Sequence, residues 1–231
     1  RKLVKALSLE TVHIVIQKEL IFSLIIMGCL SLSFIYIGLK FKKADPLQKP
    51  KGILLVVETL VDMVGKYMHS IMPSQFEKNY YPYFAMMFVY LVFSNVSGLL
   101  GFEAPTSNYS ITLSITLITF TLIQFNAIRT KGGLTYLKDL VWPPTNILGT
   151  IAPLISLSMR LFGNILSGSI LMSLVYAFTG YLSSFVMSFN FLGPVIAPIL
   201  HVYFDVFAGC IQTLVFITLS SILIALEADT D

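Results

Sequence analysis

Two ionisable side chains, Arg160 and Asp205, stand inside long apolar stretches of the sequence. An arginine keeps its proton at working pH, so Arg160 can attract or repel charge but cannot relay protons. A carboxyl group such as that of Asp205 can take up a proton and release it. Placing either charge in lipid costs at least about 2.5–3.5 kcal/mol on insertion scales, and intramembrane charges usually mark ion pathways. The pair therefore indicates a protein that helps to move ions across a bilayer.

Each charge belongs to a polar stripe with the helical spacing i, i+4, i+8 and i+11. The first stripe consists of Ser156, Arg160, Asn164 and Ser167, and the second of His201, Asp205, Gly209 and Gln212. Gly163 and Gly168 remove bulk beside the first stripe, so a neighbouring helix or a moving partner could approach closely there. The second stripe could line a water-filled half-channel and pass protons.

Structural interpretations of the same residues remain open. Arg160 could pair with Asp205 and lock two helices together. His201 could be an interfacial histidine near the outer end of its helix, and Gln212 could form a hydrogen bond between helices. A carboxylate as deep as Asp205 needs water, Arg160 or His201 as its partner.

The composition identifies lipid as the solvent of this chain. Of its 231 residues, 56% are hydrophobic and only 12% are charged, whereas about a quarter of a soluble domain is charged. Cys29 and Cys210 both lie in apolar runs and fit neither a metal site nor a disulfide framework. The net charge of +3 comes from basic residues in the segments between the spans, where they set the orientation in the membrane. We therefore expect no cofactor, no metal and no nucleic-acid partner.

Five apolar stretches are long enough to cross a membrane, and no soluble domain is visible. They cover residues 20–39, 83–100, 111–128, 147–178 and 195–226. A span needs about 20 residues, so the last two stretches must tilt steeply, bend or extend beyond the bilayer. Pro153 and Pro198 lie near the starts of these two stretches, where a bend is least costly.

Residues 53–70 have a different pattern. One helical face of this segment is charged or titratable, and it carries Glu58, Asp62, Lys66 and His69. The pattern predicts an amphipathic helix that lies on the membrane surface, with a short sixth span as the alternative. The expected fold is an all-α, single-domain membrane protein over residues 1–231. Its parts are a first span at 20–39, the surface helix at 53–70, a helical pair at 83–128 and a long tilted ion-translocating hairpin at 147–227.

The distribution of lysine and arginine predicts the orientation. Basic residues gather between the first two spans and after the third, whereas residues 101–110 and 179–194 contain none. The positive-inside rule places the basic segments on the inner side, the N-terminus outside and the C-terminus inside. The basic residues that oppose this orientation are Arg1, Lys2, Lys5 and Lys18.

Several strings of residues resemble subunit a of the F-type ATP synthase. They are Ser158-Met-Arg-Leu-Phe-Gly-Asn164, Asp205-Val-Phe-Ala-Gly-Cys-Ile-Gln212, Pro105-Thr-Ser-Asn108 and Lys131-Gly-Gly133. The resemblance extends from about Tyr81 to Leu226, and the N-terminal third matches only in layout. It implies a non-catalytic stator beside a rotating ring of small hairpin subunits, each with an essential carboxyl group. Peripheral-stalk subunits and the lipid bilayer would be the other partners.

The resemblance also implies how ions would move. Two offset aqueous half-channels lead to the ring carboxylates from opposite sides. Arg160 lies between these half-channels, favours the deprotonated ring carboxylate and prevents a direct proton leak. The ion-translocation residues implied in this way are Arg160, Asp205, Gln212, Asn164, His201, Ser169 and Glu227.

Two positions depart from the pattern of the family. Nine residues after the arginine, many bacterial relatives have Glu and many mitochondrial ones His, but this chain has Ser169. We therefore expect Asp205, with His201, to carry the outer half-channel. The second departure is Asn146, where an acid often helps the inner half-channel, and Glu227 is the expected substitute.

Two other functions and one other location are alternatives to a stator subunit in a bacterial membrane. A self-contained secondary transporter is the main alternative, but it would usually show internal repeats, and none is evident. A membrane scaffold would tolerate apolar replacements of both Arg160 and Asp205. The expected location is a bacterial plasma membrane, with a mitochondrial or plastid energy-transducing membrane as the alternative.

Overall fold

The computed structural model describes residues 17–43, 52–72, 74–100, 104–185 and 190–226, and in these ranges it contains helices but no strand. The α-helices are α2 (Lys18–Lys43), α3 (Ile53–Ile71), α4 (Ser74–Val96), α5 (Tyr109–Lys131), α6 (Gly133–Val141), α7 (Thr145–Ser184), α8 (Gly193–His201) and α9 (Gly209–Leu226). The 3₁₀ turns η1 (Ser97–Leu100) and η2 (Pro105–Ser107) join α4 to α5, and a π-helix, η3 (Val202–Ala208), joins α8 to α9.

Five helical segments of the described chain are long and apolar enough to span a membrane. They are Lys18–Lys43, Asn79–Leu99, Tyr109–Lys131, Thr145–Ser184 and Gly193–Leu226. The expected all-α membrane fold with five spans is therefore confirmed. Helix α3 is not among the five, and its position on the membrane surface stays a prediction, as does the division of the domain into a pair and a hairpin.

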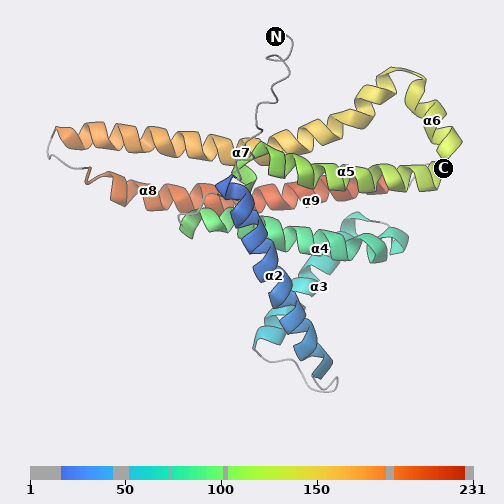
Figure 1. Cartoon of the computed structure of the whole chain (residues 1–231), viewed down its shortest axis with the longest axis horizontal. Coiled ribbons are helices and arrows are strands. Elements are labelled where there is room, and N and C mark those ends of the chain that lie inside the picture. Colours follow the sequence, from blue (N-terminus) through green and yellow to red (C-terminus); the bar gives the residue numbers. More distant parts are fainter. Residues whose placement is uncertain (1–16, 44–51, 73, 101–103, 186–189, 227–231) are drawn as a thin grey trace, which may run out of the picture.

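Four elements run side by side along the long axis of the molecule: α4, α5, α7 and the nearly continuous α8–η3–α9 (Figure 1). Helix α9 packs against α4 on one side and against α5 and α7 on the other. Helix α2 crosses this layer at a steep angle and contacts α4. Helix α3 packs against α4 and α9.

Helix α7 is much longer than a bilayer is thick. Its 40 residues correspond to about 60 Å at 1.5 Å per residue, twice the roughly 30 Å hydrocarbon core. Figure 1 shows that the helix bends, with its first turns directed toward α6. Pro153 lies in this part of the helix and has no N–H group to bond the carbonyl of Gly149, which favours a bend. The remainder of α7 packs against α8 and η3 as one arm of a hairpin.

The core lies where α3, α4, α5, α7 and α9 meet. Its fully buried side chains include Met68, Phe84, Leu91, Leu161 and Phe216. Most buried hydroxyl groups form hydrogen bonds within the bundle, as a lipid environment favours, and those of Ser94 and Ser220 are the exceptions among the described residues. For example, the Thr116 hydroxyl donates to the carbonyl of Thr112 over 2.8 Å.

Asn95 ties three elements together next to the π-helix. Its Nδ2 atom donates to the Gly209 carbonyl at 3.0 Å and to Thr213 Oγ1 at 3.3 Å, and its Oδ1 atom accepts from Thr106 Oγ1 at 3.2 Å. Gly209 permits this contact, because a Cβ atom placed there would lie 2.8 Å from Asn95 Cβ. The contact therefore holds the end of α4, η2 and the start of α9 in one arrangement.

The sequence did not indicate α6 or η3. Helix α6 begins after Gly132, which has a φ of 80°, a backbone conformation that glycine adopts without strain. Its nine residues are too few for a periodic apolar pattern to stand out, and the segment was expected to be an inner loop. The π-helix was not expected because the sequence from Val195 to Leu226 reads as one continuous apolar helix.

We expect Gly209→Ala to destabilise the protein. The added methyl group would overlap Asn95, so α4 and α9 would have to move apart, at a cost of about 1–3 kcal/mol for overpacking. The measurement is the thermal unfolding temperature of the detergent-solubilised protein. Gly38→Ala is the matched control, because no atom lies within 4 Å of a Cβ at that helical glycine. Equal unfolding temperatures for the two variants would contradict the close α4–α9 contact.

Candidate functional site

Arg160 lies on a face of α7 that points away from the core. Met159 and Arg160 are exposed, whereas Leu157 and Leu161, on the neighbouring face of the helix, are buried. Within the described part of the chain, no hydrogen bond or ion pair involves the Arg160 guanidinium. The structural alternative, a lock between Arg160 and Asp205, is therefore not formed. The guanidinium is a fixed positive charge that no described residue neutralises.

The polar side chains that follow Arg160 in α7 form no hydrogen bond with it. The Nδ2 atom of Asn164 is buried and has no hydrogen-bond partner among the described residues. Ser167 and Ser169 are exposed, and their hydroxyls donate to the carbonyls of Asn164 and Leu166 in their own helix, at 3.0 and 2.8 Å. Among the described residues, the Ser169 hydroxyl therefore has no hydrogen bond to another helix.

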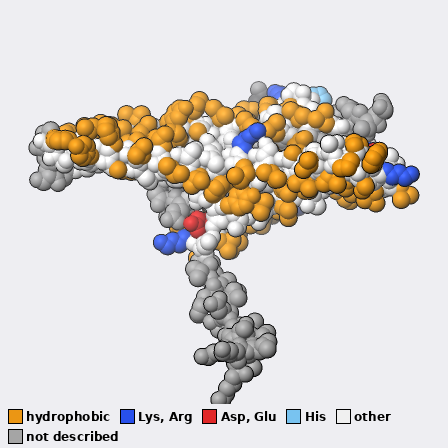
Figure 2. Space-filling model, turned by 90° about the horizontal axis from the view of Figure 1, so that it is seen from above, with side chains coloured by type: hydrophobic (Ala, Val, Ile, Leu, Met, Phe, Trp, Pro, Cys, Tyr) orange, Lys and Arg blue, Asp and Glu red, His pale blue; other side chains and the backbone are white. Residues whose placement is uncertain are grey.

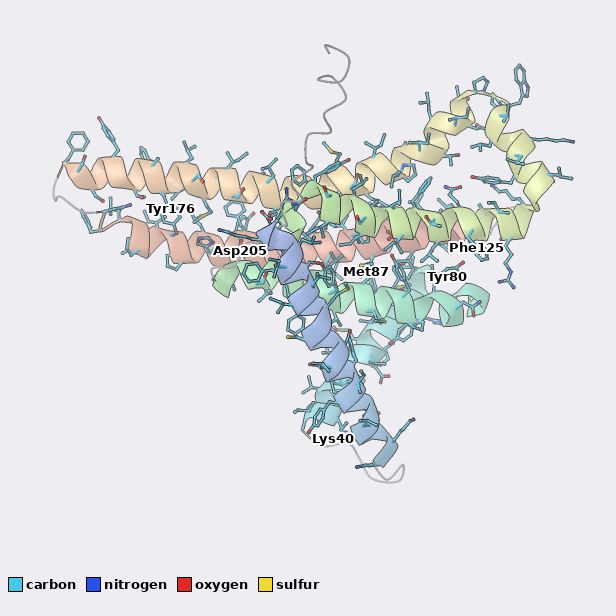
Figure 3. The ribbon with its side chains drawn as sticks, in the orientation of Figure 1. Lys40, Tyr80, Met87, Phe125, Tyr176 and Asp205 are labelled. Carbon is cyan, nitrogen blue, oxygen red and sulfur yellow. The ribbon has the colours of Figure 1, made fainter. Side chains whose placement is uncertain are left out.

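Asp205 is part of a chain of polar contacts that joins α7 to the π-helix. Its Oδ2 atom lies 2.9 Å from His201 Nδ1, and the Nε2 atom of the same imidazole lies 3.3 Å from the Tyr176 hydroxyl. The side chains of His201 and Asp205 are 35% and 23% exposed, so water can reach both. Of the three partners open to Asp205 at the outset, His201 is the one that the structure shows. Figure 3 shows Tyr176 nearer the turn between α7 and α8 than Asp205.

The backbone of η3 carries Asp205 at its centre. A π-helix has i→i+5 hydrogen bonds in place of i→i+4, and such segments are rare and frequent at functional sites. On its other side the carboxyl group meets η1, because a Cβ atom built on Gly98 would lie 3.2 Å from Asp205 Cγ. The Asp205 side chain therefore fits between its own helix and a glycine of the α4–α5 connection.

The second stripe is divided between two environments. His201 and Asp205 are partly exposed, whereas Gly209 and Gln212 are buried against the bundle. The Nε2 atom of Gln212 has no partner among the described residues. Buried amide donors normally have a partner. Gln212 and Asn164, one on each arm of the hairpin, are exceptions, since no described residue accepts from their free amide donors.

The two glycines beside the first stripe also differ. A Cβ atom on Gly168 would lie 3.5 Å from Phe204 Cβ, so Gly168 allows the two arms of the hairpin to approach each other. No atom lies within 4 Å of a Cβ on Gly163, which is open beside Arg160. At Gly168, the space expected for a neighbouring helix is therefore occupied by Phe204 of the other hairpin arm. At Gly163, the corresponding space is open.

Exposed apolar side chains flank Arg160 along α7. They include Ile151, Ile155, Met159, Leu166, Ile170 and Leu174. Figure 2 shows a face of the molecule on which hydrophobic side chains predominate and Lys and Arg side chains are few. A face of this kind is suited to lipid or to another membrane-embedded chain.

The remaining predicted residues are placed as follows. Asn146 lies in the first turn of α7, and its Nδ2 atom donates to the carbonyl of Asp139 over 2.7 Å. Glu227 lies outside the described residues. Tyr176 was missed, because its 25-residue separation from His201 becomes a contact only through the pairing of the two hairpin arms. The described residues contain no group of His, Cys, Asp and Glu that could hold a metal ion.

Comparison with known proteins identifies the family to which the chain belongs. A family model described as "ATP synthase A chain" matches residues 20–225. A protein named "ATP synthase subunit a" from Mycoplasma genitalium is 36% identical over 209 residues, which cover 81% of this chain and 71% of that protein. Proteins of the same name from Mycoplasma pneumoniae (81% of this chain, 71% of that protein) and Helicobacter hepaticus (76% of each) are 35% and 30% identical. With its five spans and a match over nearly its whole length, this chain belongs to the ATP synthase A chain family.

Proposed function

We propose that this protein is the proton-translocating, non-catalytic stator subunit of a rotary F-type ATP synthase in a bacterial plasma membrane. The observation that carries the proposal is the Arg160 guanidinium, which is exposed on a membrane-length helix and has no partner in the described part of its own chain. Family membership and the bacterial relatives support the same conclusion.

The partner of Arg160 comes from another subunit. An unpaired charge at membrane depth is costly, so a carboxylate that passes in front of Arg160 is stabilised in its ionised form. In the proposed complex the exposed face of α7 lies against a ring of small hairpin subunits, each with an essential carboxyl group. Arg160 forces each ring carboxyl to release its proton before it passes. Because arginine does not give up its own proton, no proton leaks directly between the two half-channels.

The outer half-channel runs along Tyr176, His201 and Asp205. Tyr176 lies toward the turn that the charge distribution places outside (Figure 3). The His201 imidazole contacts Tyr176, and Asp205 follows four residues later in the π-helix. The two contacts of 3.3 and 2.9 Å allow a proton to move from one side chain to the next. The free amide donors of Gln212 and Asn164 then bind the water or the ring carboxylate that receives this proton. Ser169, whose hydroxyl donates to its own helix, contributes little.

The geometry favours a stator over a self-contained secondary transporter. Transporters hold their ion site between their own helices, near the interface of internal repeats. Here Arg160 is on the outside of the hairpin, where its charge acts on a partner chain. The membrane potential supplies about 2.3 kcal/mol per charge for each 100 mV, and a fixed barrier prevents the loss of this energy by leak.

Arg160→Ala, studied in membrane vesicles that contain the whole complex, is expected to abolish ATP-driven proton pumping. Without the guanidinium, ring carboxyls keep their protons past the barrier, so the vesicles also become more permeable to protons. The measurement is ATP-driven acidification of the vesicle interior, followed with a pH-sensitive dye. Met159→Ala, at the adjacent exposed position, is the control and is expected to retain pumping. Coupled pumping at the normal rate in Arg160→Ala vesicles would contradict the proposed function.

Asp205→Asn is expected to slow passive proton conduction through the membrane sector by about tenfold or more, the scale of effect of losing a proton-transferring group. The amide keeps the shape of the side chain but cannot accept a proton from His201. Conduction is measured in vesicles from which the catalytic head has been removed, after a potential is imposed. Tyr203→Phe removes an exposed hydroxyl from the same π-helix and serves as the control. If Asp205→Asn conducts like the control, the outer half-channel lies elsewhere.

A further inference from the structure

A second polar site lies at the opposite end of α7 from Tyr176. It is an open cavity of about 310 Å³, lined by Lys131, Tyr136, Asp139, Leu140, Asn146, Gly149 and Thr150. A water molecule needs only about 10–15 Å³ of such volume, and it needs polar partners. Both requirements are met, so this cavity can hold several waters.

Three helices build the walls of this cavity. The Tyr136 hydroxyl of α6 donates to Gln124 Oε1 of α5, and the Asn146 amide of α7 donates to the Asp139 carbonyl of α6 over 2.7 Å. Helix α6 is thereby held across the ends of α5 and α7. The cavity is part of the folded bundle and not an incidental space in a loop.

The charge distribution places this cavity on the inner side of the membrane. Arg129, Lys131 and Lys138 all lie at this end of the bundle, on the last turns of α5 and on α6. The positive-inside rule assigns such segments to the inner aqueous phase. The cavity therefore opens on the side opposite to the Tyr176–His201–Asp205 chain.

Asp139 is the carboxylate of this cavity. Between residues 104 and 226 the sequence has two acids, Asp139 and Asp205. Asp205 belongs to the outer chain of contacts, whereas Asp139 is exposed and lines the inner cavity. Within residues 104–226, one acid therefore lies on the outer side of Arg160 and one on the inner side.

A strip of α7 leads from the cavity to Arg160. Its members are spaced by three and four residues and so share one helical face: Asn146, Gly149, Pro153, Ser156 and Arg160. The first two line the cavity, and all but the half-buried Pro153 are exposed. Fourteen residues correspond to about 21 Å along the helix. Apart from the arginine, the strip carries no large side chain, which leaves room for water when a partner covers α7.

We propose that Asp139 is the proton acceptor at the mouth of the inner half-channel, an inference that rests on the proposed stator function. A ring carboxyl group that reaches Arg160 from the inner side loses its proton to water along the strip. The proton then binds an oxygen of the Asp139 carboxylate and leaves for the inner aqueous phase, and the same steps run in reverse during ATP-driven pumping. At each transfer one O–H bond breaks and another forms, without any change of oxidation state.

The test uses vesicles prepared with the whole complex, from which the catalytic head is then removed so that passive proton conduction through the membrane sector can be measured. Asp139→Asn is expected to slow conduction about tenfold, as loss of a proton-transferring group does, and Asp139→Glu to retain it. Thr150→Asp in the Asp139→Asn background is expected to recover conduction. Thr150 lines the same cavity, and its hydroxyl donates only to its own helix at Asn146, over 2.8 Å. The control is Asp62→Asn, which removes an exposed acid of α3 that does not line this cavity.

Normal conduction in Asp139→Asn overturns the proposal. A slow Asp139→Asn variant that Thr150→Asp does not improve also overturns it, because the residue would then act only by holding α6 in place. If Glu227→Gln slows conduction and Asp139→Asn does not, the inner acid is Glu227. Failure of the stator function itself is recognised separately, since it would leave coupled pumping intact in the Arg160→Ala complex.

Discussion

The structure depends on one constraint, an arginine in a membrane-length helix whose charge the described residues of its own chain do not neutralise. The Arg160 guanidinium carries a permanent charge, and the described residues of its own chain offer it no ion pair. Placing such a group in lipid is costly, which is why we propose that a partner chain supplies the negative charge. In the proposed function, the length of α7, its exposed apolar flank and the open space at Gly163 present this charge to a neighbouring chain.

The rest of the bundle holds the surroundings of Arg160 in place. The Asn95–Gly209 contact ties α9 to α4, and Gly168 lets Phe204 approach α7. Asp205 directly follows Phe204 in the π-helix, which ends one residue before Gly209. A small change in the packing of α4 against α9 would therefore move the carboxylate and its histidine together. In the proposed function, close packing at the glycines fixes the helices, and the proton moves along the partly exposed polar side chains of the π-helix.

Much of the fold and part of the site follow from local sequence. The shortage of charge identifies lipid as the solvent, apolar length predicts five spans, and a charge without a topological explanation singles out Arg160. The remainder depends on how distant segments pair. A helix of 40 residues can meet its hairpin partner in many registers, so the Tyr176–His201 contact is invisible until the chain is folded. The cavity at Asp139 requires α6, a nine-residue helix too short to predict from periodicity. For Asp205, sequence left three possible partners, and folding selects His201.

The central claim is that the charge partner of Arg160 belongs to another subunit. The most direct measurement is a structure of the intact complex in a lipid membrane, with the distance from the Arg160 guanidinium to every surrounding carboxyl group. We predict that the nearest carboxyl group belongs to the ring, that ring helices cover the exposed face of α7, and that Asp205 remains paired with His201. An Arg160 guanidinium bonded to Asp205, with lipid alone against that face of α7, would contradict the account.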